Sequence, residues 1–223
     1  MLHIPGVLDA AALADVRGLL AQGQWTDGRA TAGHLSAQVK HNRQLDEDDP
    51  FALQAGALVL DALAHQPVFA AGALATCISA PLFNRYEGGE TYGDHIDGAI
   101  RPLARGRMRA DLSATLFLSD PESYEGGELV IAATGGEHAV KLSAGDMILY
   151  PSGARHKVTP VTNGRREAAV IWVQSLVRDP LQREMLFELD GTIQSLRAAK
   201  TNQTELLALT GLYHNLLRLW SEP

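Results

Sequence analysis

The middle of the chain, from about residue 75 to residue 176, alternates short apolar runs with turn residues. Glycine pairs and proline-containing segments stand between the runs, as expected of connections between strands. Strands this closely spaced, without helices between them, are typical of a β-sandwich or barrel rather than of a parallel α/β sheet. The runs predict strands over residues 75–83, 91–97, 111–118, 128–132, 139–142, 146–150, 156–161 and 168–176.

Helical periodicity precedes this region. Asp9 fits the N-cap position of a helix whose apolar residues fall at positions 13, 16, 19 and 20. A second helix is predicted from about Pro50 to His65, after an acidic run. Residues 62–84 carry no charge and are long enough to cross a bilayer. Because they include prolines, a glycine and an asparagine, we interpret them as a helix end, a turn and a strand.

Helical periodicity also follows the predicted strands. Asp179-Pro180 is a typical helix start, and the helix is expected to run to about Ala199. Another helix begins near Gln203 and has a wide leucine-rich face, which the barrel or a second subunit must cover. A homo-oligomer is therefore one of two arrangements considered. The change of period predicts a division into residues 1–177 and a C-terminal helical unit, residues 178–223.

Composition narrows the classes of function. The 223 residues have a net charge of −7 and contain no polybasic segment, which argues against general nucleic-acid binding. The single cysteine, Cys77, cannot form an intrachain disulfide, in keeping with a reducing compartment. The first ten residues have neither the basic nor the apolar region of a signal peptide. We therefore expect a cytoplasmic protein without a membrane span.

The segment His95-Ile96-Asp97 is the first candidate for chemistry. Side chains at i and i+2 of a strand share a face, so His95 and Asp97 are expected to project together. One imidazole and one carboxylate are two thirds of a facial triad, which leaves open positions on Fe(II) for co-substrate and O₂. A second histidine from another strand would complete the triad.

His156 is the histidine best placed for this role. It follows a buried strand and a turn and opens a new strand, whereas the others fall in expected helices, terminal segments or a glycine-rich turn. The full set of candidates is His3, His34, His41, His65, His138, His156 and His214.

A pair of arginines follows ten residues later. A guanidinium binds a carboxylate through two parallel hydrogen bonds, a geometry that suits the distal carboxylate of 2-oxoglutarate. If Asn163-Gly164 were a two-residue hairpin turn, strand parity would place Arg165, and not Arg166, on the face of His156. The pattern alone leaves both arginines open.

Three blocks of sequence resemble the PKHD-type hydroxylases, bacterial Fe(II)/2-oxoglutarate dioxygenases related to prolyl 4-hydroxylases. The resemblance covers essentially the whole chain. Arg165 stands where a small residue is expected. The blocks are NRYEGGETYGDHIDGAIR (84–101), DLSATLFLSDPESYEGGELVI (111–131) and GDMILYPSGARHKVTPVTNGRREAAVIWVQSLVRD (145–179).

The resemblance implies a mainly β fold, a double-stranded β-helix (jelly roll) flanked by N-terminal helices and followed by a C-terminal helical pair. It further implies that iron is bound by His95, Asp97 and His156, and 2-oxoglutarate by Arg166. A tyrosine before the H-x-D segment, Tyr86 or Tyr92, would line the co-substrate pocket. L-Ascorbate is implied as the reductant that restores Fe(II).

The implied reaction is hydroxylation of a substrate C–H bond, with release of succinate and CO₂. Asp97 favours hydroxylation, because related halogenases lack this carboxylate. The substrate stays open between a small molecule and a peptide. Arg101, Arg105, Arg107 and Arg109 are expected to form a solvated loop or, alternatively, a rim that attracts an anionic substrate.

Two other classes of protein are considered. The first is a cupin-like metal-binding barrel without 2-oxoglutarate chemistry, and Asp97 argues against it because cupins typically use three histidines and a glutamate. The second is a catalytically silent barrel that serves as an interaction module.

Overall fold

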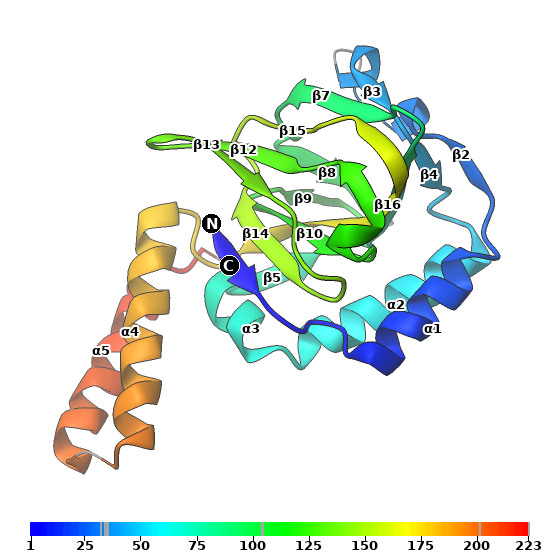
Figure 1. The fold of residues 1–223 in the computed structure, drawn as a ribbon. Helices are drawn as coiled ribbons and strands as arrows, with labels where there is room; N and C mark the ends of the chain where they lie inside the picture. The colour runs from blue at the N-terminus through cyan, green and yellow to red at the C-terminus, as the bar shows by residue number, and fades with distance from the viewer. Residues whose placement is uncertain (32, 34–35, 104, 201, 223) are drawn as a thin grey trace.

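The computed structural model describes residues 1–223 except 32, 34–35, 104, 201 and 223. Two β-sheets face each other as a barrel, helices cover the outside of one sheet, and a helical pair extends away from the barrel (Figure 1). The prediction of a mainly β jelly-roll fold with flanking helices is confirmed.

The larger sheet forms the floor of the barrel. Its centre is the long strand β16 (Val161–Ser175), which pairs antiparallel with both β10 and β6. Strands β11 and β5 also pair with β16, along its two ends. The remaining order of this sheet is β1 (Leu2–Ile4), β14 (Met147–Pro151), β10 (Leu112–Phe117), β16, β6 (Leu82–Glu87), β4 (Arg43–Leu45) and β2 (Trp25–Asp27), with β11 (Tyr124–Gly126) and β5 (Ala75–Ile78) off this path.

The smaller sheet forms the opposite wall. It brings β15 next to β7, so that segments sixty residues apart in sequence lie side by side (Figure 1). A separate hairpin of β8 (Ile100–Pro102) and β9 (Arg107–Arg109) lies beyond β7 in sequence. The sheet order is β13 (Gly136–Val140), β12 (Leu129–Ala133), β15 (His156–Val158), β7 (Thr91–His95) and β3 (Lys40–His41).

Three helices pack against the outside of the larger sheet: α1 (Ala10–Leu20), α2 (Pro50–Ala64) and α3 (Pro67–Ala73). Their apolar faces and the outward-facing residues of the central strands form the main hydrophobic core, in which Val16, Val59 and Ile171 are fully buried. This core leaves the inner face of β16 free to line the barrel cavity.

The C-terminal pair consists of α4 (Pro180–Ala198) and α5 (Gln203–Trp220), which run antiparallel (Figure 1). Asp179 caps α4 by accepting hydrogen bonds from the amides of Leu181 and Gln182. The buried Arg183 guanidinium donates to the carbonyl oxygen of Val177 at 2.6 Å and ties the helix to the end of the barrel. None of the described residues of α5 is buried, so this helix is held mainly through its contact with α4.

Several predicted elements differ from the structure. The strand predicted over residues 156–161 is divided between β15 and β16, which belong to different sheets. The predicted strand over residues 75–83 is broken into β5 and β6, because Pro81 interrupts the ladder of amide donors. The turn predicted within residues 62–84 is in fact α3, whose first residue is Pro67 and whose cap is Gln66. Among the described residues no helix is long and apolar enough to span a membrane.

The cap of α2 provides a test of local stability. Asp49 accepts hydrogen bonds from the amides of Phe51 and Ala52 at 2.8 and 3.1 Å. Asp49→Ala is expected to lower the free energy of unfolding by about 1 kcal/mol, measured by urea denaturation. Asp48→Ala is the matched control, because the exposed Asp48 side chain caps nothing, and should stay within about 0.5 kcal/mol of the wild type. Equal losses in the two variants would show that the cap contributes nothing specific.

Candidate active site

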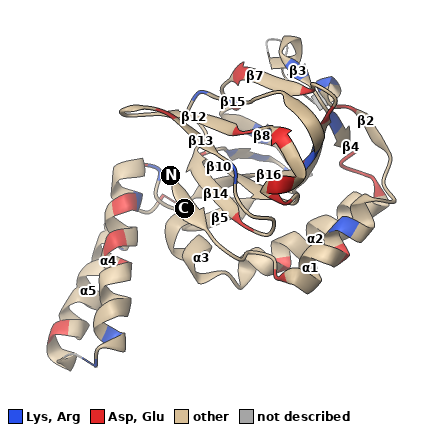
Figure 2. Cartoon of the chain, viewed as in Figure 1, with Lys and Arg blue, Asp and Glu red and all other residues tan. Residues whose placement is uncertain are grey.

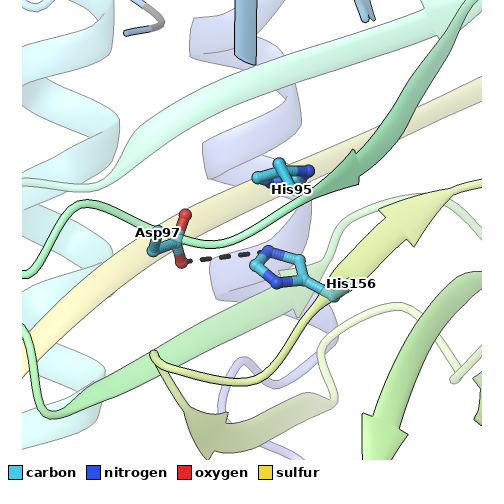
Figure 3. Close-up of side chains that lie close together, drawn as sticks. All are labelled: His95, Asp97 and His156. Atoms are coloured by element: carbon cyan, nitrogen blue, oxygen red, sulfur yellow. Dashed lines mark ion pairs between the residues drawn. The ribbon is translucent and has the colours of Figure 1, made fainter. Parts of the chain in front are cut away.

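His95, Asp97 and His156 converge at one end of the barrel (Figure 3). One possible ligand atom from each of the three lies within 4.8 Å of the others. The pairing of β15 with β7 sets His156 directly opposite His95, and Asp97 follows two residues after His95. The Nε2 atom of His156 lies 3.8 Å from Oδ2 of Asp97, a spacing that a single metal ion between them can bridge.

Both imidazoles are held in one orientation by the backbone. The Nδ1 atom of His95 lies 2.8 Å from the carbonyl oxygen of Gly93, and Nδ1 of His156 lies 2.9 Å from that of Ala154. A carbonyl oxygen only accepts hydrogen bonds, so each Nδ1 carries the proton. The Nε2 lone pairs are then left for a metal ion, which is the usual arrangement of metal-binding histidines.

The carboxylate of Asp97 is oriented by a chain of buried hydroxyl groups. Ser113 on β10 donates to Oδ2 of Asp97 at 2.6 Å, and its own oxygen lies 2.8 Å from Oγ of Ser152. Ser113 and Ser152 are 0% and 2% exposed, so water does not compete for these bonds. The sequence contained a signal for this role, because Ser113 and Thr115 are polar residues in the fully buried strand β10.

Burial and, next, the charge of His156 lower the pKa of His95 to about 4. The imidazole is therefore neutral at neutral pH, and the neutral form is the one that binds a metal ion. The Tyr92 ring stacks on the His95 ring at 3.6 Å between centroids and shields it from solvent. Two imidazole nitrogen atoms and one carboxylate form a donor set that suits Fe(II).

A cavity leads from this triad into the barrel, where Arg166 lies among its lining residues. The Arg166 side chain is 2% exposed, and its Nε and Nη2 atoms have no hydrogen-bond acceptor among the residues that the structure describes. Two buried guanidinium nitrogen atoms without acceptors are unfavourable, so this end of the cavity is suited to an anion. Arg166 therefore fits the distal carboxylate of 2-oxoglutarate, and the triad of His95, Asp97 and His156 fits the metal ion.

Close packing holds the Arg166 side chain in place. The rings of Tyr86 and Phe117 lie 5.3 and 5.4 Å from its guanidinium carbon. Gly127, at φ +67°, passes so close that a Cβ atom there would lie 2.9 Å from Cδ of Arg166. The chain therefore needs glycine at this position to let the arginine reach the cavity.

The parity argument that favoured Arg165 was wrong, because Asn163-Gly164 is not a hairpin turn. Both residues lie inside β16 and pair with β11, where the register shifts at a bulge. Arg165 points outward and is bound to Glu87 at 2.9 Å, while Arg166 faces the cavity. The sequence could not show that residues 159–160 cross from one sheet to the other, which removes the parity relation between His156 and Arg166.

Both candidate tyrosines line the cavity, in different places. Tyr86 pairs with Arg166 across the sheet, is 3% exposed, and has its pKa raised to about 12 by burial. Tyr92 lies at the metal end, against His95. Five further lining residues were not singled out in the sequence, because they come from strands whose partners it does not reveal: Lys40, Asn84, Thr115, Tyr150 and Trp172.

The remaining histidines do not join the triad. His41 and His138 lie on strands rather than in a helix and a turn, and His3 is bound to Asp146 at 2.8 Å. His34 lies outside the described residues. The four arginines of the predicted loop do not act as one cluster either: Arg101 lines the cavity, and Arg109 forms an ion pair with Asp111 at 2.7 Å.

Comparisons with known proteins agree with this geometry. Residues 81–174 match the sequence model of the 2OG-Fe(II) oxygenase superfamily, and residues 181–222 match that of the PKHD-type hydroxylase C-terminal domain. A PKHD-type hydroxylase of Stenotrophomonas maltophilia (strain R551-3) is 54% identical, over 100% of this chain and 99% of its own. One of Klebsiella pneumoniae (strain 342) is 56% identical, over 100% of this chain and 99% of its own.

Solved structures share the fold at low sequence identity. A Pseudomonas putida prolyl-4-hydroxylase superposes with a TM-score of 0.51 at 21% identity, covering 78% of this chain and 91% of its own. The carbocyclase SnoK from nogalamycin biosynthesis gives 0.56 at 16% identity, covering 79% and 80%.

The fold and the matched superfamily define the chain as an Fe(II)- and 2-oxoglutarate-dependent dioxygenase. Within this class it belongs to the PKHD-type hydroxylases. The cupin-like alternative is not favoured by these matches.

The hydroxyl chain behind Asp97 leads to a prediction about metal binding. Ser113→Ala removes the donor to the carboxylate and is expected to weaken Fe(II) binding about 10- to 100-fold, as measured by anaerobic titration. The control is Ser123→Ala, because Ser123 is exposed and bonds only locally to Asp120. Circular dichroism checks that both variants are folded. Unchanged affinity in folded Ser113→Ala would show that Asp97 needs no such support.

Proposed function

We propose that this chain hydroxylates a C–H bond of an organic substrate while converting 2-oxoglutarate and O₂ to succinate and CO₂. One oxygen atom enters the new hydroxyl group and the other enters succinate. The observation that carries the proposal is that one cavity contains both a metal-binding triad and a buried arginine without an acceptor. A barrel used only for interactions with partners needs neither.

His95, Asp97 and His156 are the proposed iron ligands. Bound Fe(II) supplies the site where O₂ is activated, and the three ligands leave part of its coordination sphere open. The backbone carbonyl groups of Gly93 and Ala154 hold the proton of each neutral ring on Nδ1, so that Nε2 is the atom left to bind iron. Ser113 keeps the Asp97 oxygen aimed at the same point.

Arg166 is the proposed partner of the distal carboxylate of 2-oxoglutarate, with Tyr86 beside it. The guanidinium is already held by Gly127, Tyr86 and Phe117, so little side-chain freedom is lost on binding. The apolar surroundings strengthen the ion pair with the carboxylate and exclude water from this end of the cavity. Tyr92 borders the metal end and is proposed to limit access to His95.

Other features of the proposal rest on the sequence and on family membership. L-Ascorbate would restore Fe(II) after uncoupled turnover, and the single free cysteine suits a reducing cytoplasm.

The substrate is a small molecule or a peptide, and no nucleic-acid partner is proposed. Figure 2 shows acidic and basic residues interspersed over the barrel and helices. Residues 178–223 are proposed as a separate helical unit, which could contribute to a homo-oligomer.

Loss of activity in two variants tests the core of this proposal. Succinate formation from 2-oxoglutarate, with Fe(II) and ascorbate present, is expected from the wild type and to be absent in His156→Ala. Arg166→Ala should weaken 2-oxoglutarate binding about a hundredfold or more, because it removes a charge-assisted bidentate contact in a buried site. Binding is followed anaerobically by the visible charge-transfer band of the Fe(II) complex.

Arg165→Ala is the matched control, because it removes the adjacent arginine, which faces solvent. It should retain both the band and succinate formation. If the wild type binds Fe(II) but not 2-oxoglutarate, the dioxygenase chemistry proposed here is wrong. If Arg165→Ala loses co-substrate binding while Arg166→Ala retains it, the assignment of the carboxylate clamp is wrong.

A further inference from the structure

The cavity contains two further cationic residues that the iron and 2-oxoglutarate sites do not use. Lys40 comes from β3, and Arg101 comes from the hairpin after the metal-binding segment. Both line the same cavity as the triad. A cavity that already holds Arg166 would gain nothing from them in binding a single dicarboxylate.

Arg101 is held in place by an aromatic ring. Its guanidinium carbon lies 3.5 Å from the centroid of the Trp172 ring. Among the residues that the structure describes, no carboxylate forms an ion pair with Arg101 and no acceptor bonds its guanidinium. Stacking therefore fixes the plane of the guanidinium and leaves its N–H groups available.

Trp172 adds a second donor at the same place. It is 6% exposed, and its Nε1–H has no acceptor among the described residues. A buried N–H group without an acceptor is unfavourable, so a ligand that supplies one binds more tightly. Arg101 and Trp172, in contact with each other on the cavity lining, therefore both have N–H groups without an acceptor among the described residues.

Lys40 strengthens the positive potential of this region. Its side chain is 4% exposed, and Nζ donates to Oε1 of Gln44 at 2.9 Å. Burial and, next, the charge of Arg101 lower its pKa to about 8, so the ammonium is still mainly protonated at neutral pH. Of the carboxylates whose charges reach these two cations, Asp97 belongs to the metal-binding triad, Asp27 is bonded to Arg29 and Glu47 is exposed.

The spacing along β16 separates this region from the co-substrate clamp. Arg166, Val170 and Trp172 alternate along the strand and line one wall of the cavity. The separation of six positions from Arg166 to Trp172 corresponds to about 20 Å of extended strand. One molecule of 2-oxoglutarate is too short to reach both ends.

The balance of charges in the cavity also separates this region from the co-substrate clamp. With iron and 2-oxoglutarate bound as proposed, the charges of Fe(II) and Arg166 are balanced by Asp97 and the two carboxylates of the co-substrate. Arg101 then remains as a positive charge with no ion-pair partner among the described residues. Leu82, Val170 and the 57% exposed Ile96 give the same part of the cavity an apolar lining.

We propose that Arg101, Trp172 and Lys40 form the substrate subsite, and that it binds the carboxylate of an organic anion with an apolar body. This inference rests on the proposed function, since it assigns Arg166 to the co-substrate. It narrows the substrate class from any small molecule or peptide to one that presents a carboxylate next to an apolar group.

Calorimetric titration of simple probes tests the subsite. The protein is loaded anaerobically with Fe(II) and 2-oxoglutarate, and benzoate, phenyl phosphate or neutral benzamide is added. Benzoate is expected to bind at least about tenfold more tightly than benzamide. Arg101→Gln and Lys40→Met should each weaken benzoate binding about tenfold. Trp172→Phe should weaken it too, because it removes the N–H donor and part of the ring on which Arg101 stacks.

Arg107→Gln is the matched control, because Arg107 is an exposed arginine of the same hairpin that does not line the cavity. It should bind benzoate like the wild type. The charge-transfer band of each variant shows that it is folded and holds both iron and co-substrate. If the wild type lacks this band, the proposed function fails.

The subsite itself is overturned by several results obtained with the band intact. One is no binding of benzoate to the wild type, and another is equal binding of benzoate and benzamide. Equal affinity of Arg101→Gln and Arg107→Gln for benzoate would also overturn the subsite. A separate contrary result is loss of the charge-transfer band when benzoate is added to the wild type, which would show that benzoate displaces 2-oxoglutarate from the Arg166 site. Tighter binding of phenyl phosphate than of benzoate would show that the subsite prefers a phosphate group, and the assignment of a carboxylate would be wrong.

Discussion

The antiparallel pairing of β7 with β15 is the interaction on which the site depends. It places His95 directly opposite His156, and residues two positions before each histidine supply the carbonyl oxygen that orients its ring. The same short strands hold Tyr92 against His95. A shift of β15 by one residue would turn His156 away from His95 and Asp97, which lie together on the other segment, so the register of a few backbone hydrogen bonds defines the metal centre.

A buried positive charge is the second constraint. The core of a barrel normally excludes an arginine, yet Arg166 lies between Tyr86 and Phe117 with two nitrogen atoms lacking an acceptor. The fold accommodates it through Gly127, where only a residue without a side chain leaves enough room. The buried Arg166 therefore lowers the free energy of unfolding of the empty protein, at the position where an anion is proposed to bind.

Much of this arrangement could be predicted from the sequence, for identifiable reasons. The chain segment His95-Ile96-Asp97 is short, so strand alternation alone brings two of the three triad residues together. The helix caps Asp9, Asp49 and Asp179 are local as well. What depends on non-local pairing could not be predicted: the crossing between the sheets before β16, the contact of Arg101 with Trp172, and short strands such as β3, which has two residues and no alternation.

The two Arg166 nitrogen atoms that lack an acceptor have a consequence for the lifetime of the protein in a cell. A ligand that binds only the folded state stabilises it by about 1.4 kcal/mol for each tenfold rise in concentration above its dissociation constant. A charge left without a partner makes the empty protein the less stable form. The fraction of chains exposed to proteolysis would then rise when 2-oxoglutarate is scarce, so the abundance of the protein, and not only its turnover, would follow the supply of this metabolite.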